Sequence, residues 1–102
     1  MTVKKQYYKT KPYCKVTFHL SKKIVGKANK VAIAGDFNEW QVDCNLMKAQ
    51  KNGDFSASVL LPKGHEYQYR FVLDGQEWVT DQTADKKIFC QFANACNAVV
   101  VV

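Results

Sequence analysis

Residues Val31 to Trp40, with the sequence VAIAGDFNEW, decide the fold of this chain of 102 residues. The stretch begins with small and β-branched apolar residues, which predict a strand. It then meets a glycine, an aspartate and an asparagine, residue types that favour turns. The tryptophan that follows is a rigid side chain held by a tight turn, so it can pack in the core or offer a flat surface to a ligand. Trp78, just past the turn signal Asp74-Gly75, is a second tryptophan of this kind, and we expect the two to lie near each other.

The remaining strands are predicted from apolar and polar residues that alternate with a period of two. These segments are 13–20, 54–61 and 67–73, with shorter strands at 76–80 and 99–102. Asn52-Gly53, Pro62-Lys63-Gly64 and Asp74-Gly75 are turn signals. Residues 21–29, 41–50 and 81–97 are expected to be connections. Short strands separated by turns, without a segment of helical period, predict an all-β sandwich.

The length corresponds to a single domain, and a hydrophobic content of 47% is typical of a globular protein. No apolar run approaches the roughly 20 residues that a membrane-spanning helix needs. The lysine-rich start of the chain has no apolar segment of the kind found in secretory signals. We therefore expect a cytoplasmic protein without a membrane partner.

The net charge of +6 is unevenly distributed. Residues 1–30 contain nine lysines and no acidic residue, whereas residues 31–102 contain six basic and nine acidic residues. Residues 1–12 are predicted to be a basic, flexible arm, and residues 13–102 the folded domain. Such an arm could contact nucleic acid, but the chain has no arginine cluster or RNA-binding aromatic motif, so nucleic acid is not the expected partner.

The sequence predicts no catalytic residue, no metal site and no cofactor. It contains no C-x-x-C pair and only two histidines, so a zinc site is not expected. Without a secretory signal the four cysteines are expected to be free thiols. There is no nucleophile motif and no phosphate-binding glycine loop. Carboxylates beside the turns are expected to cap them, although a glycosidase pair among them stays open. These carboxylates are Asp36, Glu39, Asp74, Glu77 and Asp81.

Two motifs, read together, resemble carbohydrate-binding module family 48. G-x-F-N-x-W spans residues 35–40, and Y-x-F-x-x-D-G-x-x-W spans residues 69–78. The family includes the glycogen-binding domain of the AMP-activated protein kinase β subunit and the early-set domain of isoamylases and branching enzymes. The similarity covers residues 13–102. It implies an immunoglobulin-like (early-set) β-sandwich that binds α-glucan without catalysing a reaction.

By position, the resemblance implies a carbohydrate-binding site made of five residues. Trp40 and Trp78 correspond to the stacking tryptophans, and Arg70 stands where the family commonly has a lysine that contacts sugar hydroxyls. Asn94 and Asn97 belong to the loop that supplies the remaining polar contacts.

This chain departs from the family pattern in the same loop and beside the second tryptophan. Cys96 takes the place of a sugar-binding asparagine, and Asn94 stands where a threonine is usual. Glu77 is an extra residue before Trp78.

The leading hypothesis is a glycogen- or starch-binding module of weak affinity, about micromolar to millimolar. The alternative is an early-set domain that has lost sugar binding and acts as a structural or protein-interaction module. Its partner would then be a glycan-processing enzyme or a regulatory protein.

Overall fold

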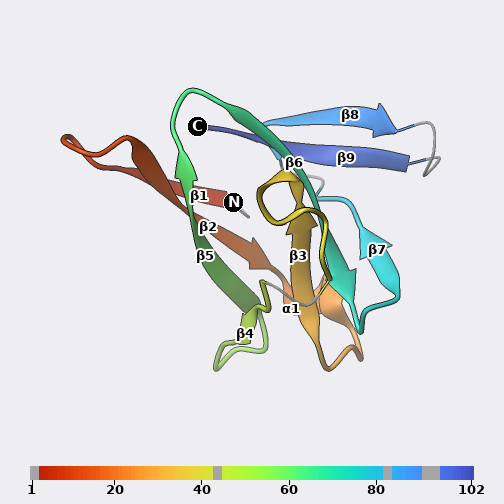
Figure 1. Cartoon of the computed structure of the whole chain (residues 1–102). Coiled ribbons are helices and arrows are strands. Elements are labelled where there is room, and N and C mark those ends of the chain that lie inside the picture. The colour runs from red at the N-terminus through yellow and green to blue at the C-terminus, as the bar shows by residue number, and fades with distance from the viewer. Residues whose placement is uncertain (1–2, 43–44, 82–83, 91–94) are drawn as a thin grey trace.

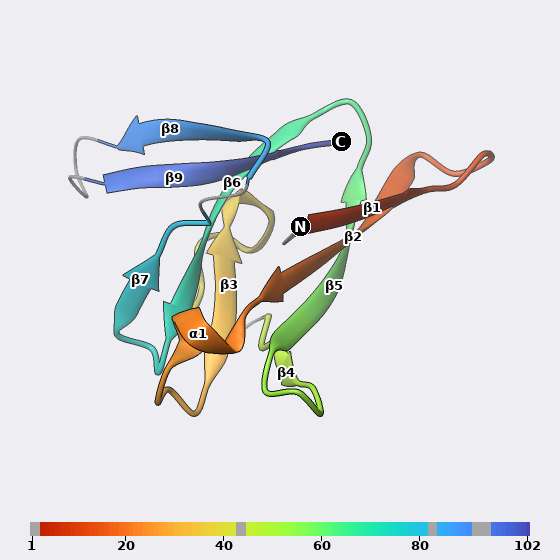
Figure 2. The same ribbon diagram turned by 180° about the vertical axis from the view of Figure 1, so that it is seen from behind.

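The computed structural model describes residues 3–42, 45–81, 84–90 and 95–102. They form two antiparallel sheets that pack face to face as an immunoglobulin-like β-sandwich (Figures 1 and 2). The first sheet, which we call sheet A, has the order β1 (Val3–Tyr7), β2 (Tyr13–Leu20), β5 (Phe55–Pro62), β4 (Lys48–Ala49). The second, sheet B, has the order β3 (Val31–Gly35), β6 (Glu66–Leu73), β9 (Ala95–Val101), β8 (Lys86–Cys90), and β7 (Glu77–Val79) also pairs with β6. Two short helical segments, α1 (Lys22–Val25) and the 3-10 turn η1 (Asp36–Asn38), flank β3 in the chain.

The core lies between the sheets and is built from the inward positions of the alternating strands. Phe18 of β2 packs edge-on against Tyr69 of β6, with ring centroids 4.8 Å apart. The Tyr69 hydroxyl donates a hydrogen bond of 2.8 Å to the buried carboxylate of Asp81. Burial, reinforced by this carboxylate, raises the pKa of Tyr69 well above its ordinary value. The hydroxyl therefore stays protonated and keeps its partner.

The predicted flexible arm differs from the observed structure. Val3–Tyr7 is an edge strand that pairs with β2 along its whole length. Val3 is buried in the core, and Lys5 forms a 2.6 Å ion pair with Asp85. The sequence did not predict this strand because its lysines interrupt the apolar pattern, and an edge strand tolerates charged residues at most of its positions.

Two predicted connections also contain regular structure. Residues 21–29 include α1, and residues 81–97 include β8 and the start of β9. Lys86, Lys87, Ile88 and Phe89 of β8 are all exposed, so these four residues show no alternation of buried and exposed positions.

The outer edge of β6 is shared by two strands. Residues 66–69 of β6 pair with β9, whereas residues 71–73 pair with β7. Arg70 lies where the partner changes, and β8 and β9 run away to one side from this point (Figure 1). This division places Arg70 between β7 and β9 on the outer face of sheet B.

Among the described residues no helix has the length and apolar character needed to cross a membrane.

Candidate functional site

The turn after β3 fixes the position of Trp40. The side chain of Asn38 accepts a hydrogen bond from the Gly35 amide (3.0 Å) and donates one to the Ile33 carbonyl (2.9 Å). The Trp40 amide donates back to the Gly35 carbonyl (3.0 Å). Glu39 and Trp40 both have positive φ, 57° and 60°, a conformation that is costly for side chains of this size. The surrounding hydrogen bonds hold this conformation and place the half-buried indole at the end of the strand.

Asp36 connects this turn to β6. One carboxylate oxygen accepts a 3.1 Å hydrogen bond from the Trp40 indole Nε1, and the other accepts a 2.8 Å bond from the Gln68 amide. The indole is therefore held at its polar edge, which leaves its apolar faces free of polar partners. The sequence predicted Asp36 only as a turn cap, because its partner on β6 is a backbone group that no side-chain pattern reveals.

Trp78 lies on β7 directly opposite Val72 of β6, on the outer face of sheet B. Its side chain is 41% exposed. Its ring centroid is 6.4 Å from that of Trp40, and the two ring planes are inclined by 36°. The two tryptophans, 38 residues apart in the chain, are thus in contact, as the sequence predicted.

Arg70 lies under Trp78. Its guanidinium carbon is 5.8 Å from the Trp78 ring centroid, a cation–π distance. The sequence correctly placed Arg70 on the outer face, but the side chain is only 9% exposed, since the indole covers it.

A buried hydrogen-bond chain continues from Arg70 across the sheet. Arg70 Nε donates to the Asn97 Oδ1 at 2.5 Å, and Asn97 Nδ2 donates to Gln68 Oε1 at 2.9 Å. Asn97 was expected in a loop, in contact with the ligand, whereas it belongs to β9 and is only 6% exposed. The side-chain bonds of Asn97 hold Arg70 in place. Gln68 was not predicted as a site residue, although its place two residues before Arg70 puts it on the same face.

The structure therefore brings together Trp40, Trp78, Arg70 and Asn97, while Asn94 lies outside the described residues. Beside them, the Thr80 hydroxyl donates to the Cys96 carbonyl at 2.5 Å and bridges β7 to β9. Cys96 is a partly buried free thiol.

The spacing of the two indoles determines how they can contact a ligand. Carbon atoms in contact lie about 3.5–4.0 Å apart, so a flat molecule sandwiched between two rings needs ring planes about 7–8 Å apart. A centroid distance of 6.4 Å is too short for this arrangement. The pair can instead act as one continuous aromatic surface on which a ligand lies.

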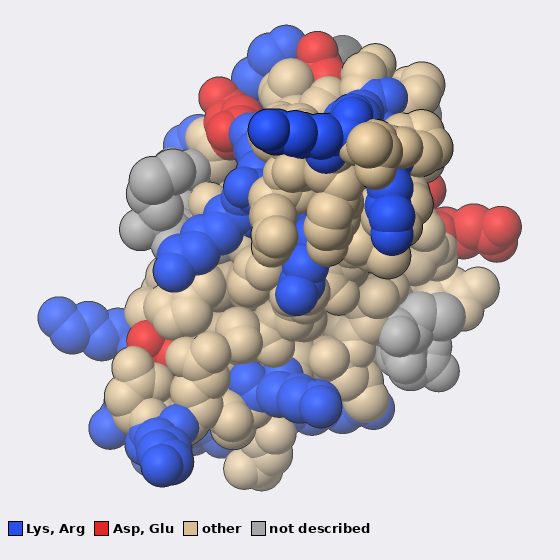
Figure 3. Space-filling model, turned by 90° about the vertical axis from the view of Figure 1, so that its left-hand side faces the viewer, with Lys and Arg blue, Asp and Glu red and all other residues tan. Residues whose placement is uncertain are grey.

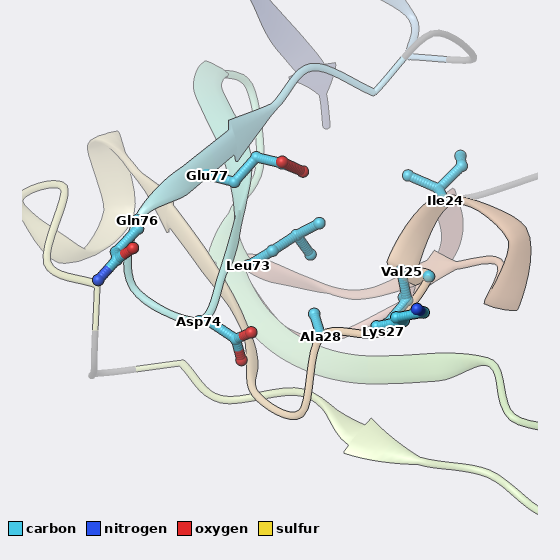
Figure 4. A pocket seen from close by; sticks show the side chains of 9 residues that line it. Ile24, Val25, Lys27, Ala28, Leu73, Asp74, Gln76 and Glu77 are labelled. Carbon is cyan, nitrogen blue, oxygen red and sulfur yellow. The ribbon is translucent and has the colours of Figure 1, made fainter.

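A hollow lies beside α1 (Figure 4). Its volume is about 440 Å³, and it is lined by α1 and the following loop together with the β6–β7 turn. Asp74 in that turn accepts hydrogen bonds from the amides of Asn29 and Lys30, 3.0 and 2.9 Å long. It therefore caps the loop before β3, whereas the sequence predicted that it would cap its own turn. Glu77 lines this hollow, while the next residue, Trp78, points to the other side of β7.

Within the part of the chain that the structure describes, no group of three His, Cys, Asp or Glu side chains could hold a metal ion. The carboxylates of Asp36, Asp74 and Asp81 all accept hydrogen bonds from the protein.

A family model for the glycogen recognition site of AMP-activated protein kinase matches residues 22–102 of the chain. This range contains both tryptophans, Arg70 and Asn97, and begins after β2. None of the curated proteins compared with the chain matches it.

Proposed function

Since the chain belongs to the family of the glycogen recognition site of AMP-activated protein kinase, we propose that it is a non-catalytic module that binds α-glucans such as glycogen or starch. The ligand lies on the surface that Trp40 and Trp78 form together.

The contact between the two indoles carries this proposal. The C–H face of a glucose ring is apolar and flat enough to lie against an aromatic face, which buries a large rigid surface at low entropic cost. Both indoles are on the outer face of sheet B, and Trp78 is the more exposed of the two. A chain of glucose units can therefore contact both rings side by side.

Arg70 supports this surface from below and offers polar groups at its edge. A guanidinium has five N–H donors, and Arg70 uses the one on Nε for Asn97. The donors that remain suit sugar hydroxyls. Because the side chain is nearly buried, its main effect is to keep Trp78 in place, and hydrogen bonds to sugar come second.

Binding to this open surface is weak, with a dissociation constant of about micromolar to millimolar. A polymer such as glycogen presents many equivalent chain ends, so a weak module works by repeated rebinding or by tethering a partner to the polymer. The partner in this view is a glycan-processing enzyme or a regulatory protein of the cytoplasm.

A protein-interaction module without sugar binding is the second candidate function. The edge strand β8 favours it, because it has an exposed apolar side chain on each face, Ile88 (43% accessible) and Phe89 (58%), and an exposed apolar edge strand can pair with another protein.

The test is calorimetric titration with maltoheptaose, together with tryptophan fluorescence. We expect saturable binding by the natural chain and none by the variant Trp40→Ala/Trp78→Ala. The variant Phe89→Ala, which removes an exposed aromatic ring outside the tryptophan pair, should bind like the natural chain. Cellohexaose, with β linkages, is the control ligand. If the folded natural chain does not bind maltoheptaose at about 10 mM, well above the millimolar end of the expected affinity range, the interaction module becomes the better explanation.

A further inference from the structure

The outer face of sheet A is strongly basic. The four strands of this sheet contain four lysines and no acidic residue. Lys5 points to the inner side and pairs with Asp85, whereas Lys4, Lys15 and Lys48 are exposed and lie on the outer face. None of these three forms an ion pair with a residue that the structure describes. Figure 3, which views the molecule from this side, shows many basic side chains and few acidic ones.

A hollow of about 370 Å³ lies on this face. It is lined by Lys4, Thr17, His19, Gln50 and Ser56. Cross-strand pairing brings these residues together, because Lys4 lies opposite Thr17, and His19 lies opposite Ser56. The volume is within the range of small-molecule sites, roughly 300–1,000 Å³.

The hydrogen bonds that the described residues make in and beside the hollow leave part of their donor capacity unused. The Gln50 amide donates to the Ser56 hydroxyl at 2.8 Å, so the Ser56 hydroxyl hydrogen is left to donate elsewhere. Thr17 and Ser58 share one hydrogen bond of 2.9 Å, which uses only one of their two hydroxyl hydrogens. Lys4 adds an ammonium group with three donors. The lining is thus rich in donors.

The acidic group nearest to this lining is already engaged. The Asp54 carboxylate contacts His19 Nε2 at 3.0 Å and accepts hydrogen bonds from the Lys22 amide (2.7 Å) and from the Asn52 side chain (3.2 Å). These contacts tie the carboxylate to His19, Lys22 and Asn52, whereas Lys4 forms no ion pair with a residue that the structure describes and keeps its charge for a ligand.

We propose that this hollow binds a phosphate monoester carried by a sugar. The Lys4 ammonium group attracts the phosphate as a point charge, and the hydroxyl and amide groups of Thr17, Ser56 and Gln50 suit the sugar hydroxyls. The site is on the sheet opposite to the tryptophan pair, so it does not depend on α-glucan binding there. The phosphate monoester belongs either to a free hexose phosphate or to a phosphorylated glucan chain.

The test is a titration followed by amide NMR, with glucose 6-phosphate as the probe. We expect saturable shifts at the amides of β1, β2 and β5 around the hollow, much weaker shifts with inorganic phosphate, and none there with glucose. A maltodextrin, phosphorylated or not, separates the two sources. Shifts at the hollow with the phosphorylated form but not with free glucose 6-phosphate assign the site to the polymer.

Two variants decide whether the hollow is a built site. Lys4→Ala should weaken binding about tenfold, the size expected for one hydrogen bond to a charged group, and Ser56→Ala should weaken it about three- to tenfold, the size expected for one neutral hydrogen bond. The matched control Lys27→Ala removes an exposed lysine beside the other hollow and should leave affinity unchanged. Circular dichroism verifies the fold of each variant.

Three results would overturn the proposal. One is an absence of saturable shifts with both the free and the polymeric phosphate ester. Another is an equal loss of affinity in Lys27→Ala, which would indicate unspecific attraction to a basic protein. The third is a set of shifts confined to Trp40 and Trp78, which would assign the ligand to the tryptophan pair.

Discussion

Replacing Trp78 with alanine should abolish most of the affinity for maltoheptaose and leave the fold intact. The side chain is 41% exposed, and a tryptophan has roughly 250 Å² of surface, so about 100 Å² of the indole faces solvent. A glucose unit lying on the ring covers about half of this area. With a matching area on the sugar, about 100 Å² in total leaves water.

At about 25 cal/mol per Å², this contact contributes up to about 2.5 kcal/mol to the free energy of binding. The contribution is about half of that if only the area of the ring counts as apolar. The loss of affinity is therefore between roughly tenfold and 60-fold. For the weak affinity that we propose, a loss of this size moves binding beyond the range of an ordinary titration.

The assay is calorimetry with maltoheptaose on the natural chain, Trp78→Ala and Trp78→Phe. Phenylalanine keeps a smaller flat ring over Arg70, so its affinity should fall between the other two. Phe89→Ala serves as the matched control, since Phe89 is even more exposed but lies outside the pair. Equal affinities of Trp78→Ala and the natural chain would refute the argument that the sugar lies on this ring.

Three further predictions concern the framework of the site. Asp36→Ala should lower the affinity for maltoheptaose several-fold, because the Trp40 indole loses the hydrogen bond that holds it. It should also destabilise the fold by about 1–3 kcal/mol, because the Gln68 amide of β6 loses its acceptor. Asp36→Asn keeps one acceptor oxygen, so its losses of affinity and stability should be smaller. Gly35→Ala should lower the thermal midpoint measured by circular dichroism by several degrees or more, since the added Cβ would lie 2.5 Å from a backbone oxygen of β6; an unchanged midpoint would contradict the close approach of the two strands. Folding lowers the pKa of Asp54 from its ordinary value of 3.8, mainly through a hydrogen bond from the Lys22 amide. The ionised carboxylate therefore stabilises the fold above about pH 4, and this contribution is lost as the pH falls through the lowered pKa of the folded protein. Asp54→Asn should therefore be less stable than the natural chain at pH ~6, with a difference in thermal midpoint that shrinks towards pH ~2; a constant difference would mean that the charge of Asp54 has no part in it.

The sequence predicted the sandwich because most of its strands have one buried face. The alternation of residues 13–20 and 67–73 directly reflects burial of Phe18 and Phe71 against the opposite sheet. The approach of Trp40 to Trp78 could also be predicted, since each follows a turn signal within a motif of known spacing.

The parts that were missed depend on contacts that leave no periodic signal. β1 and β8 are edge strands whose described side chains are mostly exposed, so their sequences lack the alternation of apolar and polar residues from which the other strands were predicted. The hydrogen bond between Asp36 and β6 uses the backbone amide of Gln68. Nearly every residue has such an amide, so the sequence does not indicate which one Asp36 binds. The burial of Arg70 follows from the pairing of β7 beside β9, a tertiary feature that places Trp78 over the guanidinium.

The anchoring of both tryptophans to β6 favours the sugar binding that we propose for this open surface. Ordering a large side chain on binding costs about 0.5–1.5 kcal/mol, a substantial part of the roughly 4–8 kcal/mol that a weak site gains. Here folding has already ordered both rings: Asp36 fixes Trp40 to the β6 backbone, and Arg70, itself held by Asn97, supports Trp78. Asn97→Ala should therefore weaken maltoheptaose binding although Asn97 is only 6% exposed, and the loss should be largely absent in a Trp78→Ala background. Additive losses in this double-mutant cycle would mean that Asn97 acts on the sugar by another route.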